Sequence, residues 1–407
     1  MKCRRLDCSG RAFGLTMIGK RWQQVLNTRG DAVAVYHADG TLTFSQIASL
    51  ALAHSTDGDH VLAQGSGIDL LVAAVAGFTN GLPVHVVEKD RTRRVPAFGI
   101  PSGTSLIKQT VGGSGVRRCQ FFTEAQIIAD VDRLHHAFGL QSDHVCVAAI
   151  SPAHSYGLTV TVLQTVLNGV PMHWLPEPFP APLNGALRQH ERVFLPGIPA
   201  LWRAWLMGGV ALDRVDLAIS AGSPLTLELE RHAFDAHGVK LHNLYGTSEC
   251  GAVAYDGAAT LRDDGSLLGA LLPGVSAEAT DTLVVQSDAV GLGYDELLPG
   301  ERFGEGCFKT CDEIRLEGEH LHFVSSHGEG INVAGRKLCP DEIATKLRKA
   351  TGVPMIDVRG QTSRDPERCQ EVVAHVGLPQ SEITVEFRQR ACAGLAPWEI
   401  PRRWLGI

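Results

Sequence analysis

Apolar and polar positions recur along the chain at two spacings, one typical of helices and one typical of buried strands. Residues 123–126, Thr-Glu-Ala-Gln, have the pattern of a capping box at the start of a helix. Apolar residues then follow at helical spacing, and Gly139 ends the helix: Ile127, Val131, Leu134 and Phe138. The short apolar run at 145–150, ended by Pro152, predicts a buried parallel strand after this helix.

A second unit of the same kind follows and fixes the fold class. It predicts a strand at 217–220, a helix at 225–237 capped by Ser223 with Pro224 in the first turn, and a strand at 239–244. Strands that alternate with helices predict an α/β protein. Ligands in such sheets bind beyond the carboxyl ends of strands, where Ser151, Ala221 and Tyr245 are expected.

The pattern changes near residue 280, which indicates a further subdomain and then a small domain. Short strands separated by glycine-rich turns predict a β-rich subdomain: 282–286, 307–310, 313–316 and 320–324. Two glycines in the polar stretch 325–330 predict a hinge, and Pro340 begins a helix. We therefore expect a core at 1–325 and a small α+β domain at 326–407.

Composition and charge exclude several classes of protein. The chain has 407 residues, enough for two or three domains, and 37 basic against 44 acidic residues give a net charge of −7. No dense basic run is present, so neither nucleic acid nor a membrane is an expected partner. The longest apolar run, 70–78, is too short to span a bilayer, and no signal peptide is evident. Ten scattered cysteines without metal-ligand spacing favour reduced thiols and a cytoplasmic location.

A glycine-rich segment at 110–118, Thr-Val-Gly-Gly-Ser-Gly-Val-Arg-Arg, is a candidate phosphate loop. Glycines let backbone N–H groups face an anion, and two arginines add charge. The segment lacks the Lys-Ser/Thr of the P-loop of NTPases, and an ordinary turn is the alternative.

Three further segments carry polar groups near predicted strand ends. Residues 243–249 end in Thr247, Ser248 and Glu249, which could bind phosphate oxygens and Mg²⁺, or form a plain capped turn. His154 follows a buried strand and is either a pocket residue or a core histidine. Asp312 could accept two hydrogen bonds from a ribose diol, or simply form a turn.

The order of these segments resembles that of the adenylate-forming superfamily, which contains acyl-CoA synthetases, aryl-acid ligases and peptide-synthetase adenylation domains. The resemblance covers roughly residues 20 to 403. Arg118 stands at the lysine position of the family's glycine-rich loop, and 245–249 is similar to Tyr-Gly-x-Thr-Glu. The remaining matches are 221–224 with the family's Gly-Ala-Pro turn, 293–294 with Gly-Tyr, 310–312 with Thr-Gly-Asp, and 331–343 with the segment that ends in Glu-Ile.

The resemblance implies a fold and a reaction. The fold is a large α/β core with stacked sheets and a β-rich subdomain, followed by a small mobile lid domain. The reaction is the activation of a carboxylic acid by ATP to an acyl-adenylate, followed by attack of a thiol. ATP, Mg²⁺ and coenzyme A or phosphopantetheine are the implied cofactors. The implied partners are a small aryl or acyl acid, an acyl carrier protein and a second copy of the chain in a homodimer.

The resemblance also implies residue roles. The catalytic residues are Ser248, Glu249, Arg118 and His154, with Glu249 as the metal ligand. Nucleotide binding falls to Thr110, Gly112, Gly113, Ser114, Gly115, Gly222, Ser223, Pro224, Tyr245, Gly246, Thr247 and Asp312. Acid binding falls to His154, Trp202, Ala221, Tyr245 and Gly246, and the thiol tunnel to Ala334 and Gly335.

Two departures from the family keep a second function open. At the hinge, Ser325-Ser326-His327-Gly328-Glu329 lacks the family's Arg and Asp, and the chain ends before the family's C-terminal lysine. Lys337, Arg402 and Arg403 are candidate substitutes. The alternative to a complete ligase is a member that binds nucleotide or acyl-adenylate only, or that performs only the thioester half-reaction.

Overall fold

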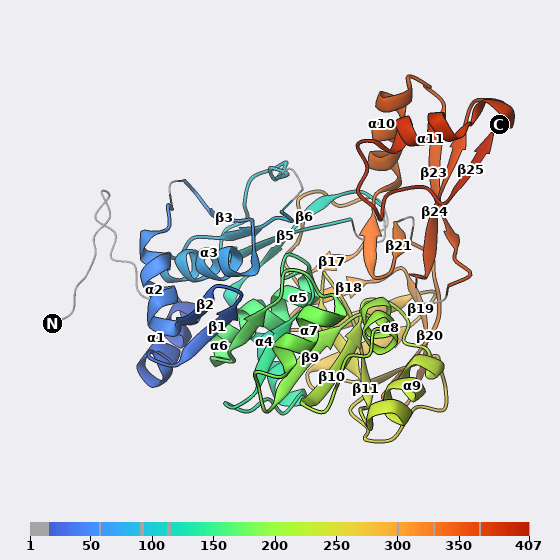
Figure 1. Cartoon of the computed structure of the whole chain (residues 1–407). Helices are drawn as coiled ribbons and strands as arrows, with labels where there is room; N and C mark the ends of the chain where they lie inside the picture. Colours follow the sequence, from blue (N-terminus) through green and yellow to red (C-terminus); the bar gives the residue numbers. More distant parts are fainter. Residues whose placement is uncertain are drawn as a thin grey trace.

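Figure 1 shows the computed structural model, which places a large body and a smaller C-terminal part beside it. The structure describes residues 16–56, 58–89, 93–111, 115–298, 301–328, 330–365 and 368–406. Mixed sheets and helices build the large body, so the predicted α/β class is confirmed. Among the described residues, no helix combines the length and the apolar character that crossing a bilayer requires.

The main sheet has eleven strands in the order β19-β20-β13-β12-β11-β10-β9-β7-β8-β1-β2. Its parallel centre runs through β10, and antiparallel strands extend it on one side toward β19. The strands are β1 Val33–His37, β2 Gly40–Thr43, β7 Val145–Ala148, β8 Met172–Trp174, β9 Val193–Gly197, β10 Val215–Ala221, β11 Leu241–Thr247, β12 Gly251–Tyr255, β13 Leu267–Leu271, β19 Asp312–Glu317 and β20 His320–Ser326.

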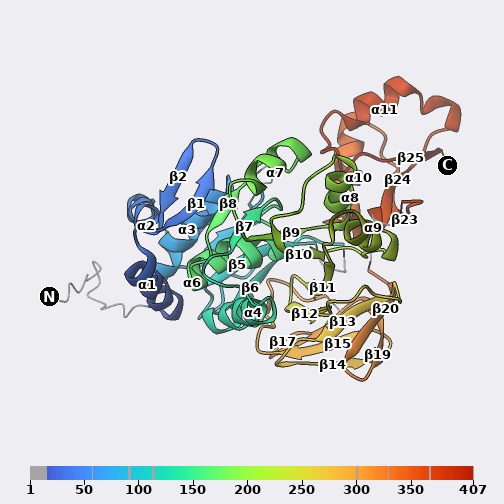
Figure 2. The same cartoon turned by 60° about the horizontal axis from the view of Figure 1, so that its bottom comes forward.

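Two smaller sheets complete the large body. One has the order β16-β6-β5-β4-β3 and the other, at the β-rich end seen in Figure 2, has the order β14-β15-β18-β17. Their strands are β3 Val61–Ala63, β4 Val84–Val86, β5 Leu106–Thr110, β6 Arg118–Phe122, β16 Gly293–Tyr294, β14 Val275–Ala279, β15 Leu283–Ser287, β17 Phe303–Gly304 and β18 Cys307–Lys309. Thr110 pairs with Arg118 in the antiparallel β5–β6 register, so the glycine-rich segment connects two strands of one hairpin.

The helices of the large body include the predicted amphipathic one. In α4, Glu124–Ala137, Thr123 and Gln126 form the expected capping box and the expected apolar stripe is buried, which confirms this prediction. The others are α1 Met17–Arg29, α2 Phe44–Ala53, α3 Gly67–Asn80, α5 Ser155–Leu158, the π-helix η1 Thr159–Leu163, α6 Gln164–Asn168, α7 Pro180–Leu187, α8 Pro199–Met207 and α9 Leu227–His237.

The predicted cap of α9 is wrong by one turn. The helix begins at Leu227, and the Thr226 side chain, not Ser223, accepts a hydrogen bond from the Leu229 backbone N–H. Pro224 consequently precedes the helix and does not lie in its first turn. This shift leaves residues 221–226 as a turn, and Gly222 within it has a φ of 82° that favours glycine.

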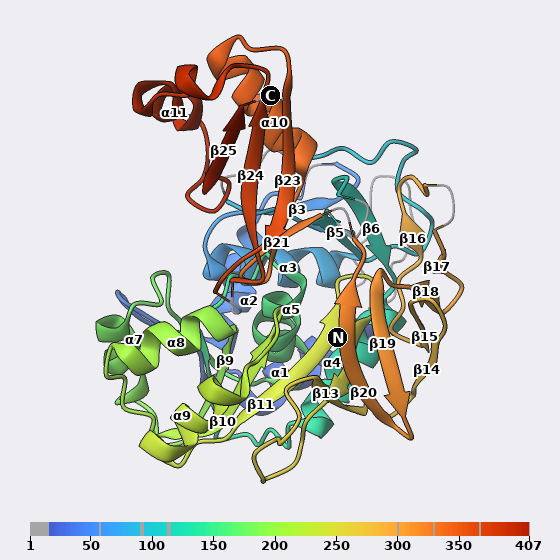
Figure 3. The ribbon, with the colours of Figure 1, turned by 90° about the vertical axis from the view of Figure 1, so that its right-hand side faces the viewer.

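The C-terminal part has a hydrophobic core of its own. It contains a three-stranded sheet of β23 Ile356–Thr362, β24 Gln370–Val376 and β25 Arg403–Gly406. The helices α10, Pro340–Thr351, and α11, Val385–Cys392, pack with this sheet, and the short 3-10 helix η3, Gln380–Glu382, lies between β24 and α11 in the chain. All buried members of this cluster lie between residues 331 and 404. The hairpin of β21, Ile331–Val333, and β22, Arg336–Leu338, extends from this part toward the large body, as Figure 3 shows.

A buried cluster of charges fixes α9 against the strand that follows it. Glu230, 1% exposed, accepts hydrogen bonds from Lys240 and from Arg262 Nε, the latter at 2.8 Å. Asp256 accepts a second bond from Lys240 at 2.7 Å. Burial raises the pKa of Glu230, but the bonds from Lys240 and Arg262 outweigh it and hold that pKa below its usual value. The cluster sets the position of β11, whose far end carries candidate site residues.

We expect Glu230→Gln to destabilise the protein by about 3–5 kcal/mol, because it leaves the buried Arg262 without a carboxylate and Lys240 with Asp256 alone. Urea unfolding followed by tryptophan fluorescence would measure this. Glu228→Gln is the matched control, since Glu228 is an exposed acid in the same first turn of α9. Equal unfolding midpoints for the two variants would show that the cluster contributes little.

Candidate active site

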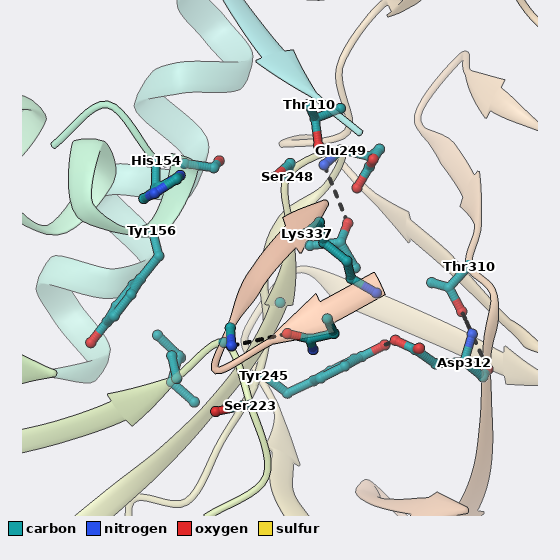
Figure 4. A pocket seen from close by; sticks show the side chains of 18 of the residues that line it. Thr110, His154, Tyr156, Ser223, Tyr245, Ser248, Glu249, Thr310, Asp312 and Lys337 are labelled. Atoms are coloured by element: carbon teal, nitrogen blue, oxygen red, sulfur yellow. Dashed lines mark hydrogen bonds between the residues drawn. The ribbon is translucent and has the colours of Figure 1, made fainter. Parts of the chain in front are cut away.

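One cavity of about 580 Å³ brings together the segments that the sequence singles out. Figure 4 shows it from close by, with side chains from the large body and from the C-terminal hairpin around it. Predicted site residues that line it are Thr110, His154, Ala221, Gly222, Ser223, Pro224, Tyr245, Gly246, Thr247, Ser248, Glu249, Asp312 and Gly335. The base of the glycine-rich loop and the Glu249 turn therefore face the same space.

Other predicted residues lie elsewhere. Gly112, Gly113 and Ser114 fall outside the described residues. Gly115 and Ala334 are described but do not line the cavity. Trp202 is fully buried in α8, where its Nε1 donates to Ile219 O at 3.0 Å and its ring packs edge-on against Trp205. Trp202 thus belongs to the core behind the cavity.

Arg118 is buried in β6 and faces away from the cavity. Its guanidinium forms two hydrogen bonds with the Glu301 carboxylate, one of them at 2.6 Å, and lies 3.6 Å from the centroid of the Tyr294 ring. Arg117, its neighbour in sequence, lines the cavity instead and bonds Glu342 of α10 at 2.5 Å. Successive side chains along an extended segment point in opposite directions, which explains why only one arginine reaches the cavity.

Glu249 lies in the turn between β11 and β12 and is 4% exposed. Its Oε1 accepts a hydrogen bond from Tyr294 OH at 2.6 Å, and its backbone N–H donates to Thr247 Oγ1 at 3.2 Å. Burial and the charge of Glu249 raise the pKa of Tyr294, so that the phenol stays a neutral donor. Arg118 supports this arrangement from behind, because it lies over the same tyrosine ring.

Tyr245 and Asp312 form a second pair in the cavity wall. Tyr245 OH donates to Asp312 Oδ2 at 2.8 Å, and the Asp312 backbone N–H donates to Thr310 Oγ1 at 3.0 Å. Burial and the nearby carboxylate raise the pKa of Tyr245, which keeps it protonated. In Figure 4 the tyrosine ring lies along the cavity with its hydroxyl toward Asp312. Tyr245 thus holds one carboxylate oxygen of Asp312, and the carboxylate still lines the cavity.

Glu88 connects the large body to the C-terminal hairpin and lies beside His154. His154 Nδ1 lies 3.8 Å from Glu88 Oε1, and Glu88 Oε2 accepts a hydrogen bond from Arg336 Nη1 at 2.9 Å. The Arg336 guanidinium lies 3.9 Å from the centroid of the Trp398 ring. Sequence reasoning missed both Glu88 and Arg336, because no local motif pairs residues so distant in the chain.

The C-terminal hairpin closes against the 221–226 turn. Gly335 has a φ of 82°, and a Cβ there would lie 3.3 Å from the Gly222 carbonyl oxygen. Ala334, with a φ of 50°, donates its N–H to Arg368 O at 2.9 Å and so shapes the tip of the hairpin. Lys337, one of the three substitute cations predicted from the sequence, lines the cavity. Two glycine backbones therefore meet where the hairpin reaches the large body.

Lys108 is a cavity residue that the sequence analysis missed. It lies on β5 between Ile107 and Gln109, and it is 9% exposed. A buried lysine within a strand is unusual, since lysine is almost never buried without a partner. That isolated charge next to the glycine-rich segment was the signal available in the sequence.

Comparison with known proteins agrees with the sequence motifs described above. Residues 110–292 match the family described as AMP-binding enzyme. Among solved structures, o-succinylbenzoate CoA synthetase from Bacillus subtilis, as a double mutant with a product analogue, has a TM-score of 0.80 at 13% identity, over 95% of this chain and 94% of that chain. A malonyl-CoA ligase bound to methylmalonyl-CoA and AMP has a TM-score of 0.75 at 18% identity, over 93% and 96%.

A third solved structure widens the range of acceptors found with this fold. The amide bond synthetase McbA from Marinactinospora thermotolerans has a TM-score of 0.72 at 17% identity, over 95% of each chain. No curated protein sequence matches the chain. Residues 110–292 are thus similar to the AMP-binding enzyme family and the chain shares the fold of these solved structures, which agrees with the predicted resemblance to the adenylate-forming superfamily.

Proposed function

We propose that this protein is an AMP-forming ligase that activates a small carboxylic acid with ATP and transfers the acyl group to a thiol. The observation that carries the proposal is the single cavity shared by Thr110, Glu249 and Asp312. In the first step, a carboxylate oxygen bonds to the α-phosphorus, and pyrophosphate leaves with the electrons of the broken P–O bond. In the second step, the thiol loses its proton to solvent, its sulfur bonds to the acyl carbon, and AMP leaves with the electrons of the broken C–O bond.

Nucleotide binding follows from the Tyr245–Asp312 pair. Because Tyr245 holds one oxygen of the carboxylate, the other lone pairs of Asp312 remain directed toward the cavity, where a ribose diol can donate to them. Thr110 and the backbone around residues 246–248 then face the phosphates. The ring of Tyr245, beside the Gly222 turn, gives the adenine base a flat surface to contact (Figure 4).

Glu249 is the residue that fits a magnesium ion. No group of three or more candidate ligands is found among the described residues, but Mg²⁺ commonly binds through one or two carboxylates, waters and substrate phosphates. A bound Mg²⁺ would neutralise phosphate charge. Tyr294 orients Glu249 by its hydrogen bond, as supporting residues around metal ligands do.

The hairpin indicates the chemical class of the acceptor, and the opposite wall of the cavity indicates the class of the acid. The Gly222–Gly335 contact leaves the least bulky possible walls for a narrow thiol such as phosphopantetheine, carried by coenzyme A or by a carrier protein. At residues 152–157, where peptide-synthetase domains carry an Asp for the α-amino group, this chain has His154, which favours an aryl or aliphatic acid over an amino acid. Eight described cysteines are free, which favours the reducing cytoplasm as the location.

A second candidate function is the thioester half-reaction alone. It is favoured by the position of the C-terminal part, because the residues from it that line the cavity come from the hairpin and from neighbouring residues such as Cys369 and Gln370. Such an enzyme would accept an acyl-adenylate made elsewhere. Thioester formation from a supplied acyl-adenylate, without pyrophosphate exchange, would identify this case.

Acid-dependent exchange of labelled pyrophosphate into ATP tests the ligase. We expect exchange with at least one member of a panel of benzoic, cinnamic and short aliphatic acids. Glu249→Gln should lower the exchange rate by about 10²-fold or more while the melting temperature is kept, because charge stabilisation at the phosphates is lost. Glu278→Gln on the exposed face of β14 is the control. Absence of exchange despite ATP binding would exclude the complete ligase.

Asp312 should determine recognition of the ribose. We expect Asp312→Ala to weaken AMP binding by about 10–100-fold, the effect of losing hydrogen bonds to a charged group, and to remove the preference for AMP over its 2′,3′-dideoxy analogue. Tyr245→Phe should cost about 2–10-fold, since it frees the carboxylate without removing it. Calorimetric titration would measure both, with Asp281→Asn as an exposed control. An unchanged preference in Asp312→Ala would remove Asp312 from the ribose site.

A further inference from the structure

The Lys108 ammonium, on β5 of the five-stranded sheet, joins the start of α5 to the turn that follows β11 of the main sheet. Its Nζ donates to Ser155 Oγ at 2.7 Å and to the Ser248 backbone oxygen at 2.8 Å, and it lies 3.9 Å from the centroid of the Phe122 ring. Ser155 follows His154 on the wall proposed to meet the acid, and Ser248 precedes the proposed metal ligand. The cation therefore lies between the two proposed reactant sites.

This charge is buried without a directly bonded carboxylate. Both hydrogen bonds of Lys108 go to neutral oxygens, and among the described residues it forms no ion pair. Burial lowers the pKa of Lys108 to about 8, and the more distant charges of Asp130 and Glu249 raise it in opposition. A buried cation in this state gains from a bound anion, because an anion repays part of the lost hydration.

The other basic side chains around the cavity are used differently. Arg117 is bonded to Glu342 of α10, and Lys337 belongs to the C-terminal hairpin. Among the described lysines and arginines that line the cavity, Lys108 is thus the one held by the core alone. Its position is fixed by two hydrogen bonds and an aromatic ring, so it needs no rearrangement to act on a ligand.

We propose that Lys108 and Ser155 form the fixed anion-binding pair where the acid carboxylate meets the α-phosphate of the nucleotide. Ser155 Oγ accepts a hydrogen bond from Lys108 and keeps its own proton to donate into the cavity. Lys108 acts by its positive charge and by holding Ser155 in position, and it transfers no proton during the reaction. This assignment rests on the proposed function, and it places a fixed positive charge in β5.

The first test measures how much the phosphate contributes to binding, and it needs no turnover. We compare the dissociation constants of adenosine and AMP for the unmodified protein, Lys108→Met, Lys108→Arg and the exposed control Lys20→Met. The adenosine-to-AMP ratio should fall about tenfold or more in Lys108→Met, recover partly in Lys108→Arg, and stay unchanged in Lys20→Met. Because adenosine probes the folded nucleoside site, a general loss of structure would weaken both ligands. An unchanged ratio in Lys108→Met overturns the proposal.

The second test separates the half-reactions. Lys108→Met should slow pyrophosphate exchange by about 10²–10³-fold, and Ser155→Ala should slow it by about tenfold. Thioester formation from a supplied acyl-adenylate should change much less. If Lys108→Met slowed both half-reactions equally, Lys108 would have a purely structural role, and the proposal would be overturned. If the unmodified protein shows no exchange, the ligase proposal fails, while the adenosine and AMP comparison still decides the role of Lys108.

Discussion

The two hydrogen bonds of the Lys108 ammonium hold the centre of this molecule together. They connect β5 of the five-stranded sheet, the first residue of α5, and the turn that follows β11 of the main sheet. Three elements far apart in the chain consequently end at one cavity. Burying a cation costs free energy because the charge loses its hydration. These contacts therefore also fix the place where a negative ligand binds most favourably. The position of the cavity and its electrostatic character thus have a common cause.

The arginines around the cavity show how the remaining charge is distributed. Arg118 is bonded to Glu301 and supports the ring of Tyr294, which in turn orients Glu249. Arg117 and Arg336 are instead bonded to acids across the boundary between the large body and the C-terminal part. One arginine therefore organises the proposed metal ligand, and the other two hold the C-terminal part near the cavity.

Local patterns predicted the elements well and the side-chain directions less well. The capping box at Thr123 was identified because its partners are three residues apart, whereas the cap of α9 depended on which of two hydroxyl residues the turn would leave in position. Arg118 was placed by motif alone, but alternation along β6 directs it to Glu301. Lys108 could not be assigned from sequence, since its partners at 155 and 248 meet it only after two sheets have packed.

The division of charge between core and hairpin has a consequence for how the site would assemble. A cation fixed in β5 is in place before a ligand arrives, and preorganised charge stabilises a transition state without the cost of reorientation. The C-terminal part contributes backbone at the Gly222–Gly335 contact, one ion pair from the hairpin and one from α10, both at partly exposed positions. Partly exposed pairs are weak and screened by salt. Movement of the C-terminal part would therefore change access for the acceptor far more than it would change the field acting on the acid and the phosphate.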